Sequence, residues 1–221
     1  MSYHVPVLLK QSVEGLNIQA GGIYVDVTFG GGGHARAIFE QMEQGTLIAF
    51  DQDPDASKNT ASFESDAQRS FIFVASNFRH LKRYLKFHKI DKVDGILADL
   101  GVSSHQFDTA GRGFSLRMDG PLDMRMNHEA GISAAEYIAD CTWEELMVVL
   151  RMYGEVKRPD RIARAIVAAR EENPITTTGE LVRILSKMAP GGRENKFYAQ
   201  IFQALRIEIN DELSALRDLL E

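Results

Sequence analysis

Four consecutive glycines at residues 30–33 constrain the fold of this chain more than any other stretch of its sequence. The residues before them, 23–29, are mostly β-branched or aromatic, which predicts a buried strand. After them, residues 34–42 return to a helical spacing of apolar residues. A strand, a glycine loop and a helix in this order let the backbone approach a ligand closely, while the helix N-terminus points at that ligand.

The glycines also fit a nucleotide-binding fingerprint. Gly30, Gly32 and Ala35 match the pattern G-x-G-x-x-G/A, although glycine runs often form only a tight turn. Two carboxylates strengthen the match, because Asp26 lies at the end of the first predicted strand and Asp51 ends the next one. A carboxylate at the tip of the second strand is suited to binding a ribose diol.

The position of Asp26 distinguishes two kinds of nucleotide site. A dinucleotide would place its pyrophosphate beside this carboxylate, where like charges repel. S-adenosylmethionine carries a positively charged ammonium group, which Asp26 can face, or the carboxylate can brace the loop. We therefore favour S-adenosylmethionine as the cofactor and keep a nicotinamide-dependent oxidoreductase as the first alternative.

Composition and charge narrow the class of protein. A chain of 221 residues suits one large domain or a domain with an insertion. The net charge of −6 excludes a surface that binds nucleic acid all over, so any RNA contact needs local basic patches. The single cysteine, Cys141, excludes an internal disulfide and suits a reducing compartment. Without a long apolar run or a signal-peptide layout, we expect a cytoplasmic protein that makes no membrane contact.

Short apolar strands alternate with helices in the first part of the chain. The predicted strands are a first one that begins at Ile23 and ends at Asp26, and residues 46–51, 71–75 and 93–100; the helices between them include 34–42 and 78–89. This alternation predicts an α/β fold with a parallel, doubly wound sheet. Gly45 is expected to end the first of these helices, and Asp53 to cap a short helix that starts at Pro54.

The pattern changes after the fourth strand. Residues 101–127 are rich in Gly, Ser, Asp and Arg and too long for an ordinary connection, which indicates a functional loop. Helices without strands follow, at residues 133–141, 142–154, 159–172 and 177–190, and a last helix is predicted at 195–221. We therefore expect residues 127–192 to be a helical insert that recognises RNA. The core domain would then consist of residues 1–126 and 193–221.

Six ordered motifs together resemble the bacterial family of small-subunit rRNA cytosine-N4 methyltransferases. They are HVPVLL at residues 4–9, DVTFGGGGH at 26–34, DLGVSS at 99–104, RGFS at 112–115, DGPLDMRM at 119–126 and FQALRI at 202–207. The resemblance covers essentially the whole chain, and six motifs in one order argue against chance.

This resemblance implies a class I methyltransferase core of Rossmann-like fold that carries a helical insert. It implies transfer of a methyl group from S-adenosylmethionine to a cytosine of 16S rRNA in the decoding region of the small ribosomal subunit, leaving S-adenosylhomocysteine and needing no metal. By position, the implied cofactor contacts are Gly32, Gly33, His34, Asp51, Phe78, Asp99 and Gln106. The reasoning from the residues adds Asp26 and Gly30.

Some of these residues also have a structural interpretation. Asp51 can cap a strand end, although the glycine loop upstream favours the cofactor. Phe78 starts an amphipathic helix and fits the core equally well when the resemblance is set aside. His34 is disfavoured as a metal ligand because the six histidines show no paired ligand spacing.

Asp99 is the residue to which we assign catalysis. It ends the fourth predicted strand at the carboxyl edge of the sheet, where open α/β sheets bind their ligands. The alternative is a structural acid that accepts N–H groups of the loop. Many DNA amino-methyltransferases have two prolines after the corresponding residue, whereas this chain has Leu100 and Gly101, so their catalytic geometry does not transfer directly.

The long loop supplies the candidate RNA contacts. They are Ser103, Arg112, Phe114, Arg117 and Arg125, since arginines beside an aromatic ring suit phosphates and stacked bases. The loop can equally be a lid braced by pairs between these arginines and Asp108, Asp119 or Asp123, and we expect both. The insert adds a basic face, which we assign to RNA, although a run of charges is usually only solvated surface. It consists of Lys157, Arg158, Arg161, Arg164 and Arg170.

The four predicted strands are fewer than the seven of a complete class I methyltransferase. The fourth strand would then be an apolar sheet edge, and we expect the chain to lack a C-terminal part of the fold. A ribosome- or RNA-binding fragment without catalysis is therefore the second alternative, and a methyltransferase for a small molecule or protein fits the core equally well. Homodimer formation stays open, because the sequence does not determine the oligomeric state.

Overall fold

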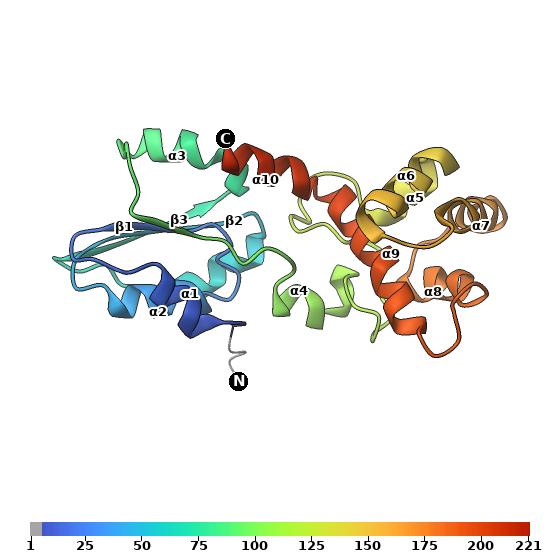
Figure 1. The fold of residues 1–221 in the computed structure, drawn as a ribbon, viewed down its shortest axis with the longest axis horizontal. Coiled ribbons are helices and arrows are strands. Elements are labelled where there is room, and N and C mark those ends of the chain that lie inside the picture. The colour runs from blue at the N-terminus through green and yellow to red at the C-terminus, as the bar shows by residue number, and fades with distance from the viewer. Residues whose placement is uncertain (1–5) are drawn as a thin grey trace. The chain divides into compact units, whose positions relative to one another are not determined.

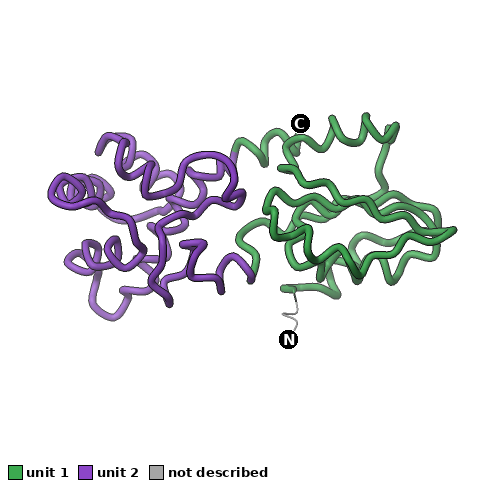
Figure 2. The backbone as a smooth tube through the Cα atoms, turned by 180° about the vertical axis from the view of Figure 1, so that it is seen from behind, with its two compact units in different colours: residues 1–104, 214–221 green, residues 105–213 purple. Residues whose placement is uncertain are grey.

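The computed structural model describes residues 6–221, which fall into two compact units (Figure 2). Of the described residues, unit 1 comprises 6–104 and 214–221, and unit 2 comprises His105–Leu213. The predicted insert, 127–192, lies within unit 2. The beginning of the HVPVLL motif, at residues 4 and 5, lies outside the described residues.

Unit 1 contains a parallel sheet of four strands. They are β1 (Ile23–Asp26), β2 (Gly45–Asp51), β3 (Arg69–Ala75) and β4 (Gly95–Leu97), in the spatial order β3-β2-β1-β4. The predicted α/β fold with a parallel sheet is thus confirmed. The strand order reverses between β1 and β4, and ligands of open α/β sheets bind at the carboxyl ends of the strands at such a point.

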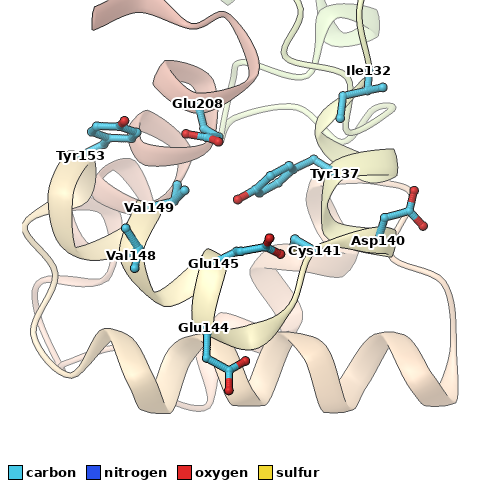
Figure 3. A pocket seen from close by; sticks show the side chains of 10 residues that line it. All are labelled: Ile132, Tyr137, Asp140, Cys141, Glu144, Glu145, Val148, Val149, Tyr153 and Glu208. Carbon is cyan, nitrogen blue, oxygen red and sulfur yellow. The ribbon is translucent and has the colours of Figure 1, made fainter.

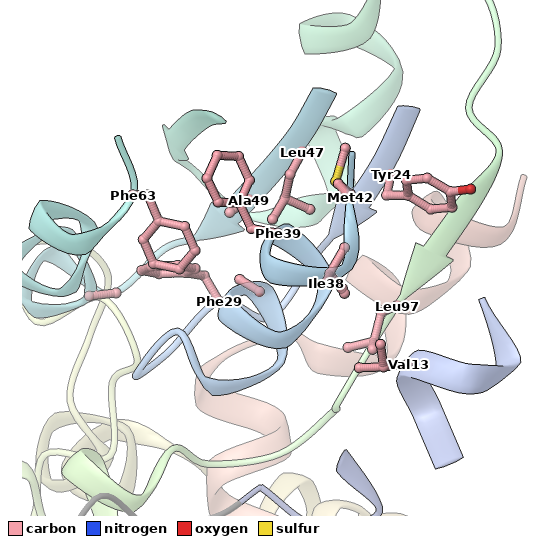
Figure 4. Close-up of a cluster of buried hydrophobic side chains, with 12 residues drawn as sticks. Val13, Tyr24, Phe29, Ile38, Phe39, Met42, Leu47, Ala49, Phe63 and Leu97 are labelled. Atoms are coloured by element: carbon pink, nitrogen blue, oxygen red, sulfur yellow. The ribbon is translucent and has the colours of Figure 1, made fainter. Parts of the chain in front are cut away.

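Both faces of the sheet are apolar, which is typical of parallel strands covered on both sides. Along β1 and β2, Tyr24 and Leu47 belong to one buried cluster, and the neighbouring residues Val25 and Ile48 belong to the other. Helices α1 (Leu9–Gly15) and α2 (Gly33–Gln41) pack on the first cluster (Figure 4). The second cluster lies on the side of α3 (Leu81–Phe87) and the end of α10 (Glu212–Leu220) (Figure 1). Successive side chains of a strand point to opposite faces of the sheet, so the strands divide the hydrophobic core into two layers.

Two details of unit 1 differ from the prediction. Gly45 does not end the helix, because α2 ends at Gln41 and Gly45 opens β2 with φ +121°. A Cβ there would lie 2.2 Å from the carbonyl oxygen of Gly22, so the close approach of two backbones requires glycine. Strand β4 is also shorter than predicted, and its Ile96 is 45% exposed.

Short helices follow the second and third strands of unit 1. The first is η1 (Pro54–Ser62), where the Asp53 side chain accepts a hydrogen bond from the backbone N–H of Asp55 and Pro54 occupies the first position. This confirms the predicted cap. The second, η2 (Phe78–His80), leads directly into α3.

Unit 2 is helical apart from the segment that leads into it. Its elements are α4 (Ser104–Asp108), η3 (Ala110–Arg112), α5 (Ala134–Asp140), α6 (Trp143–Gly154), α7 (Pro159–Glu172), α8 (Thr178–Ser186) and α9 (Glu194–Ile209). Capping boxes begin α5, α6 and α8, at Ser133, Thr142 and Thr177, so the predicted helix starts there are confirmed. Helix α6 packs against α7 and α9 around a fully buried core that includes Leu146 and Leu150.

The predicted last helix is wrong, because two helices replace it. Helix α9 ends at Ile209, and Asp211 adopts φ +47° before α10 begins. Asn210 stabilises the break: its Nδ2 donates to the carbonyl oxygen of Met124 at 2.8 Å, and its Oδ1 accepts from the N–H of Met126 at 2.7 Å. Asn210 Nδ2 also donates to the carbonyl oxygen of Arg206 at 2.8 Å, and a local bond of this kind between side chain and backbone competes with helix continuation.

In the part of the chain from residue 6 onward, no helix combines the length and the apolar character that crossing a membrane requires.

Candidate functional site

The carboxyl ends of β1 and β2 carry the two acids that the sequence placed there. Asp26 is the last residue of β1, and Asp51 is the last residue of β2. Because these strands are parallel neighbours, both carboxylates lie at the same edge of the sheet as the glycine loop that follows β1. The side chains of this edge form the candidate site in unit 1.

Asp26 is buried without full hydrogen bonding. Its side chain is 0% exposed, and its Oδ1 accepts the N–H of Thr28 at 3.0 Å. Its Oδ2 is buried and has no hydrogen-bond partner among the residues that the structure describes. Burial, assisted by the charges of Asp51 and Asp99, raises the pKa of Asp26 to about 7. A buried acceptor without a donor is costly, so this oxygen is suited to a cationic donor from a ligand.

Asp51 holds the glycine loop through hydrogen bonds, and its carboxylate can still accept hydrogen bonds from a ligand. Its Oδ2 accepts the N–H of Gly30 at 2.7 Å, and its Oδ1 accepts the N–H of Asp53 at 2.8 Å. Burial raises the pKa of Asp51 as well. Each carboxylate oxygen has a second lone pair, so Asp51 can accept hydroxyl groups of a ribose without losing either backbone bond.

The glycine loop depends on backbone conformations that favour glycine. Gly30 has φ +50° and Gly32 has φ +76°, and Gly32 is the residue before helix α2. At Gly33, a Cβ would lie 2.5 Å from Cγ of Pro6. A Cβ on Gly31 would meet nothing within 4 Å. The loop is therefore tightly packed on one side and open at Gly31, as a loop that receives a ligand must be.

Asp99 lies beyond the end of β4 and is connected to Asp26 through Thr28. The backbone N–H of Asp99 donates to Thr28 Oγ1 at 2.7 Å, and this hydroxyl lies 3.4 Å from Asp26 Oδ1. The Asp99 carboxylate is 54% exposed, and its Oδ2 is 3.8 Å from Nδ1 of His34. His34 itself is buried, and its Nε2 has no partner in residues 6–221. The sheet edge thus brings together three carboxylates and one imidazole.

Other predicted site residues have different environments. Phe78 is half-buried and packs against the cluster on the α3 face of the sheet. Ser103 lies next to the glycine loop, since a Cβ built on Gly30 would be 3.6 Å from the Ser103 Cβ. Gln106 is 4% exposed and belongs to α4 in unit 2. Of the predicted cofactor contacts, unit 1 therefore contains all except Gln106.

The predicted RNA contacts of the long loop, apart from Ser103, belong to unit 2 and are largely engaged there. Arg112 is 7% exposed and donates through Nη2 to the carbonyl oxygens of Arg125 and Met126, at 3.0 and 2.8 Å. Phe114 is buried. Arg117 is exposed, and its guanidinium carbon lies 5.9 Å from the ring centre of Phe107.

Acidic residues of the same loop have two different roles. Arg125 forms a double contact with Asp123, at 2.8 and 2.7 Å, which agrees with the predicted bracing pair. Asp119 instead accepts the N–H of Gly179 at 2.8 Å and thereby connects the loop to the first turn of α8. Hydrogen bonds from Gly179 lower the pKa of Asp119, which keeps this carboxylate charged.

The basic face of the insert is only partly available to a ligand. Arg170 donates to the carbonyl oxygens of Ile138 and Cys141, and Arg164 lies over the ring of Trp143 at 3.4 Å from its centre. Lys157, Arg158 and Arg161 are exposed, and Arg164 is exposed as well despite its contact with Trp143.

Two residues of the site were not selected from the sequence. Thr28 lies inside the DVTFGGGGH motif, and its spacing of two residues from Asp26 is the signal for a side-chain turn that could have identified it. Asn59 donates through Nδ2 to the carbonyl oxygen of Gly30 at 3.0 Å. No local pattern indicates that contact, because Asn59 lies in η1 and is distant from the loop in sequence.

Comparison with known proteins agrees with this arrangement. The sequence model of the MraW methylase family matches residues 1–221. The ribosomal RNA small subunit methyltransferase H of Cytophaga hutchinsonii is 54% identical over 219 residues, which cover 99% of this chain and 72% of that protein. The proteins of the same name from Amoebophilus asiaticus and Bacteroides thetaiotaomicron are 49% and 50% identical, covering 70% and 71% of their lengths. The chain, with its parallel sheet and glycine loop, belongs to the MraW methylase family.

Proposed function

We propose that this protein transfers a methyl group from S-adenosylmethionine to N4 of a cytosine in 16S rRNA, in the decoding region of the small ribosomal subunit. Its membership of a methylase family and the names of its relatives support the methyl transfer and the ribosomal RNA substrate. The choice of cytosine, of N4 and of the decoding region rests on the motif resemblance. The observation that carries the proposal is the unpartnered, buried Oδ2 of Asp26 beside the glycine loop.

The charges of the site fit S-adenosylmethionine better than a dinucleotide. Three carboxylates, Asp26, Asp51 and Asp99, are close enough that the charges of the latter two raise the pKa of Asp26. A pyrophosphate would add negative charge to this edge, whereas a cationic ammonium or sulfonium group would relieve the repulsion. Asp51 would hold the ribose hydroxyls, and the backbone around Gly31 would admit the rest of the cofactor.

Asp99 is suited to orienting the target amine. The lone pair of a cytosine amine is delocalised into the ring, so the nitrogen is a poor nucleophile until an acceptor holds one of its hydrogens. Asp99 is exposed, its main chain is fixed to Thr28, and His34 lies beside its carboxylate. It can therefore accept one N4–H, hold the amine in line with the methyl group that the bound cofactor supplies, and take the released proton. Positioning of this kind can lower a barrier by about 7–11 kcal/mol in favourable cases.

The target base must be unpaired or turned out of its stack before it reaches such a carboxylate. Of the loop residues assigned to RNA, Arg117 is exposed and lies over an aromatic ring, which suits a phosphate or a stacked base. Ser103, next to the glycine loop, would contact the base or its sugar. We assign Arg112, Phe114 and Arg125 to holding the loop in the shape that presents Arg117, and the exposed Lys157, Arg158 and Arg161 to the RNA backbone.

Cofactor binding and methyl transfer test the proposal separately. Titration calorimetry with S-adenosylmethionine, S-adenosylhomocysteine and NAD should show binding of the first two, and binding of NAD alone would overturn the cofactor assignment. Mass mapping of 16S rRNA from cells with and without the gene should show one methylated cytosine that depends on the gene. Binding to the small subunit without methyl transfer would favour the non-catalytic alternative.

The role of Asp99 is tested by the variant Asp99→Ala. We expect methyl transfer to fall by about 100-fold or more, as for loss of a general base, with a smaller change in cofactor affinity. Asp91→Ala removes another exposed acid of unit 1 and should leave the rate unchanged. A wild-type rate for Asp99→Ala would reject the catalytic assignment.

A further inference from the structure

Unit 2 contains a groove of about 600 Å³ between α5, α6 and the end of α9 (Figure 3). Its walls are mainly apolar and aromatic, and two of the apolar residues, Ile132 and Val148, are 54% and 50% exposed. Exposed aliphatic side chains around a concavity are typical of an interaction site rather than of ordinary surface. The groove has no part in the methyl transfer proposed above.

All charged side chains among the groove's lining residues are acidic. They are Asp140, Glu144, Glu145 and Glu208, and no lysine, arginine or histidine is among the lining residues that the structure describes. In Figure 3, the Tyr137 hydroxyl points into the space between Glu208 and Glu145, the Glu145 side chain extends toward Cys141, and Glu144 projects away. Arg170 does not line the groove, and its guanidinium donates to the carbonyl oxygens of Ile138 and Cys141. The groove therefore carries a concentrated negative charge.

The surroundings of Glu208 and Glu145 shift the pKa values of these two groove residues in opposite directions. Burial and the neighbouring acids Asp211 and Glu145 raise the pKa of Glu208, so its ionised form is disfavoured by its surroundings. Hydrogen bonds from Thr142 lower the pKa of Glu145, which keeps this second carboxylate ionised. A bound cation would reduce the repulsion between these groups.

The two properties of the groove restrict the class of its occupant. Phosphates of RNA would be repelled by the carboxylates, so the groove does not suit nucleic acid. A small molecule would normally be enclosed on most of its surface, whereas Ile132 and Val148 leave these walls open to solvent. A polypeptide segment with both aliphatic and basic side chains would satisfy the apolar walls and the carboxylates together.

We propose that the groove between α5, α6 and α9 is a docking site for a basic, aliphatic segment of a partner protein. The aliphatic side chains of the segment would cover Ile132, Val148 and Val149, and its lysines or arginines would pair with Glu145, Glu208 and Asp140. The groove is acidic, whereas the residues proposed to contact the RNA backbone, Lys157, Arg158 and Arg161, are basic. Unit 2 could therefore bind a basic protein segment and RNA through different residues.

Amide chemical shifts of the full chain, labelled with nitrogen-15, test the proposal. The probe is an octapeptide of alternating lysine and leucine with blocked termini, and the controls alternate glutamate with leucine or lysine with serine. We expect saturable shifts at α5 and α6 with the lysine–leucine peptide only. The absence of saturable shifts there, or equal binding of either control peptide, would overturn the proposal, as would binding of a single-stranded RNA octamer in the groove.

Two test variants and one control sharpen the test. Val148→Lys places a cation in the groove and should weaken binding of the peptide at least about tenfold through repulsion. Phe87→Lys is the control, since Phe87 is 77% exposed, belongs to unit 1 and is outside the groove lining, and it should change binding by less than about twofold. Glu145→Gln keeps an acceptor for the N–H of Thr142 but removes the charge, so it should weaken binding several-fold.

Wild-type affinity for the peptide in both Val148→Lys and Glu145→Gln would contradict the proposed charge pairing. Neither variant should alter affinity for S-adenosylmethionine.

Discussion

Asp26 in unit 1 and Arg112 in unit 2 are both charged residues that the fold buries, and they differ in how their charge is compensated. Asp26 is 0% exposed and keeps an oxygen without a donor, in the neighbourhood of two other carboxylates. Arg112 is 7% exposed; its Nη2 donates to two backbone carbonyls of its own unit, and its Nε is buried without a hydrogen bond among the described residues. The first charge is destabilised by its surroundings, and the second is stabilised by them.

This difference separates a binding function from a structural one. A buried charge that finds its partners within the chain contributes to the fold, and removing it leaves those partners unsatisfied. A buried charge that lacks a partner costs stability, and such cost is commonly found where a ligand will complete the hydrogen bonding. The sequence had assigned both residues to ligand contacts, and their burial alone does not distinguish them.

The largest effect is expected when Arg112 is replaced. Arg112→Leu leaves the carbonyl oxygens of Arg125 and Met126 without their donor, so the free energy of unfolding should fall by about 2–4 kcal/mol. Urea denaturation followed by circular dichroism measures this change. Arg117→Leu, at an exposed position of the same loop, is the control and should change stability by less than about 0.5 kcal/mol. Equal effects of the two substitutions would remove the distinction drawn for Arg112.

A smaller effect, on binding rather than folding, is expected for Asp26. Asp26→Asn removes the buried charge with little change in shape, so the protein should be at least as stable as the wild type at neutral pH. Affinity for S-adenosylmethionine should fall about tenfold or more, which corresponds to about 1.4 kcal/mol or more. Calorimetry and thermal unfolding measure the two quantities, with Asp91→Asn as an exposed control. Loss of stability without loss of affinity would make Asp26 a structural residue like Arg112.

The same site should also make the stability of the protein depend on pH. Because the pKa of Asp26 is raised to about 7, the folded protein retains a proton there that the unfolded chain releases near pH 4, at about its ordinary pKa. The contribution of Asp26 to stability is therefore fully present below about pH 4 and is lost as the pH rises to about 7. The difference in stability between the wild type and Asp26→Asn isolates this contribution from those of the other carboxylates.

Cofactor binding should respond to pH in the opposite direction. If the ionised Asp26 receives the cationic group, affinity should increase by up to about tenfold between pH 6 and pH 8, as the ionised fraction increases. Asp26→Asn should lack this increase. A wild-type affinity that is flat over this range would separate Asp26 from the binding site, whatever its effect on stability.

Much of the fold could be read from local patterns. The short apolar strands that alternate with helices predict a parallel, doubly wound sheet, and the structure has a buried cluster on each face of that sheet, with the neighbours Tyr24 and Val25 in different clusters. The capping residues Ser133, Thr142 and Thr177 mark helix starts that the structure confirms. These features are predictable because each depends on residues within a few positions of one another.

For the candidate site, the sequence predicted the carboxylates at the strand ends but not their hydrogen-bond partners. That Asp26 ends β1 and Asp51 ends β2 followed from strand length and the glycine loop. That Asp26 lacks a partner on one oxygen, or that Thr28 connects it to Asp99, follows only from the packing of β4 beside β1. Thr28 and Asp99 are 71 positions apart, and no local pattern specifies such a contact.

The sequence by itself determined the parallel α/β core, the glycine loop and the carboxylates at its edge, because periodicity and short-range capping are encoded within single elements. The tertiary structure decided that Arg112 is buried against the carbonyl groups of Arg125 and Met126, that the last helix breaks after Asn210 and that Gly45 opens a strand. Each of these depends on a backbone group from another segment, such as Met126, whose N–H reaches Asn210 across 84 positions. Local propensity cannot specify such partners, since they become neighbours only when the chain has folded.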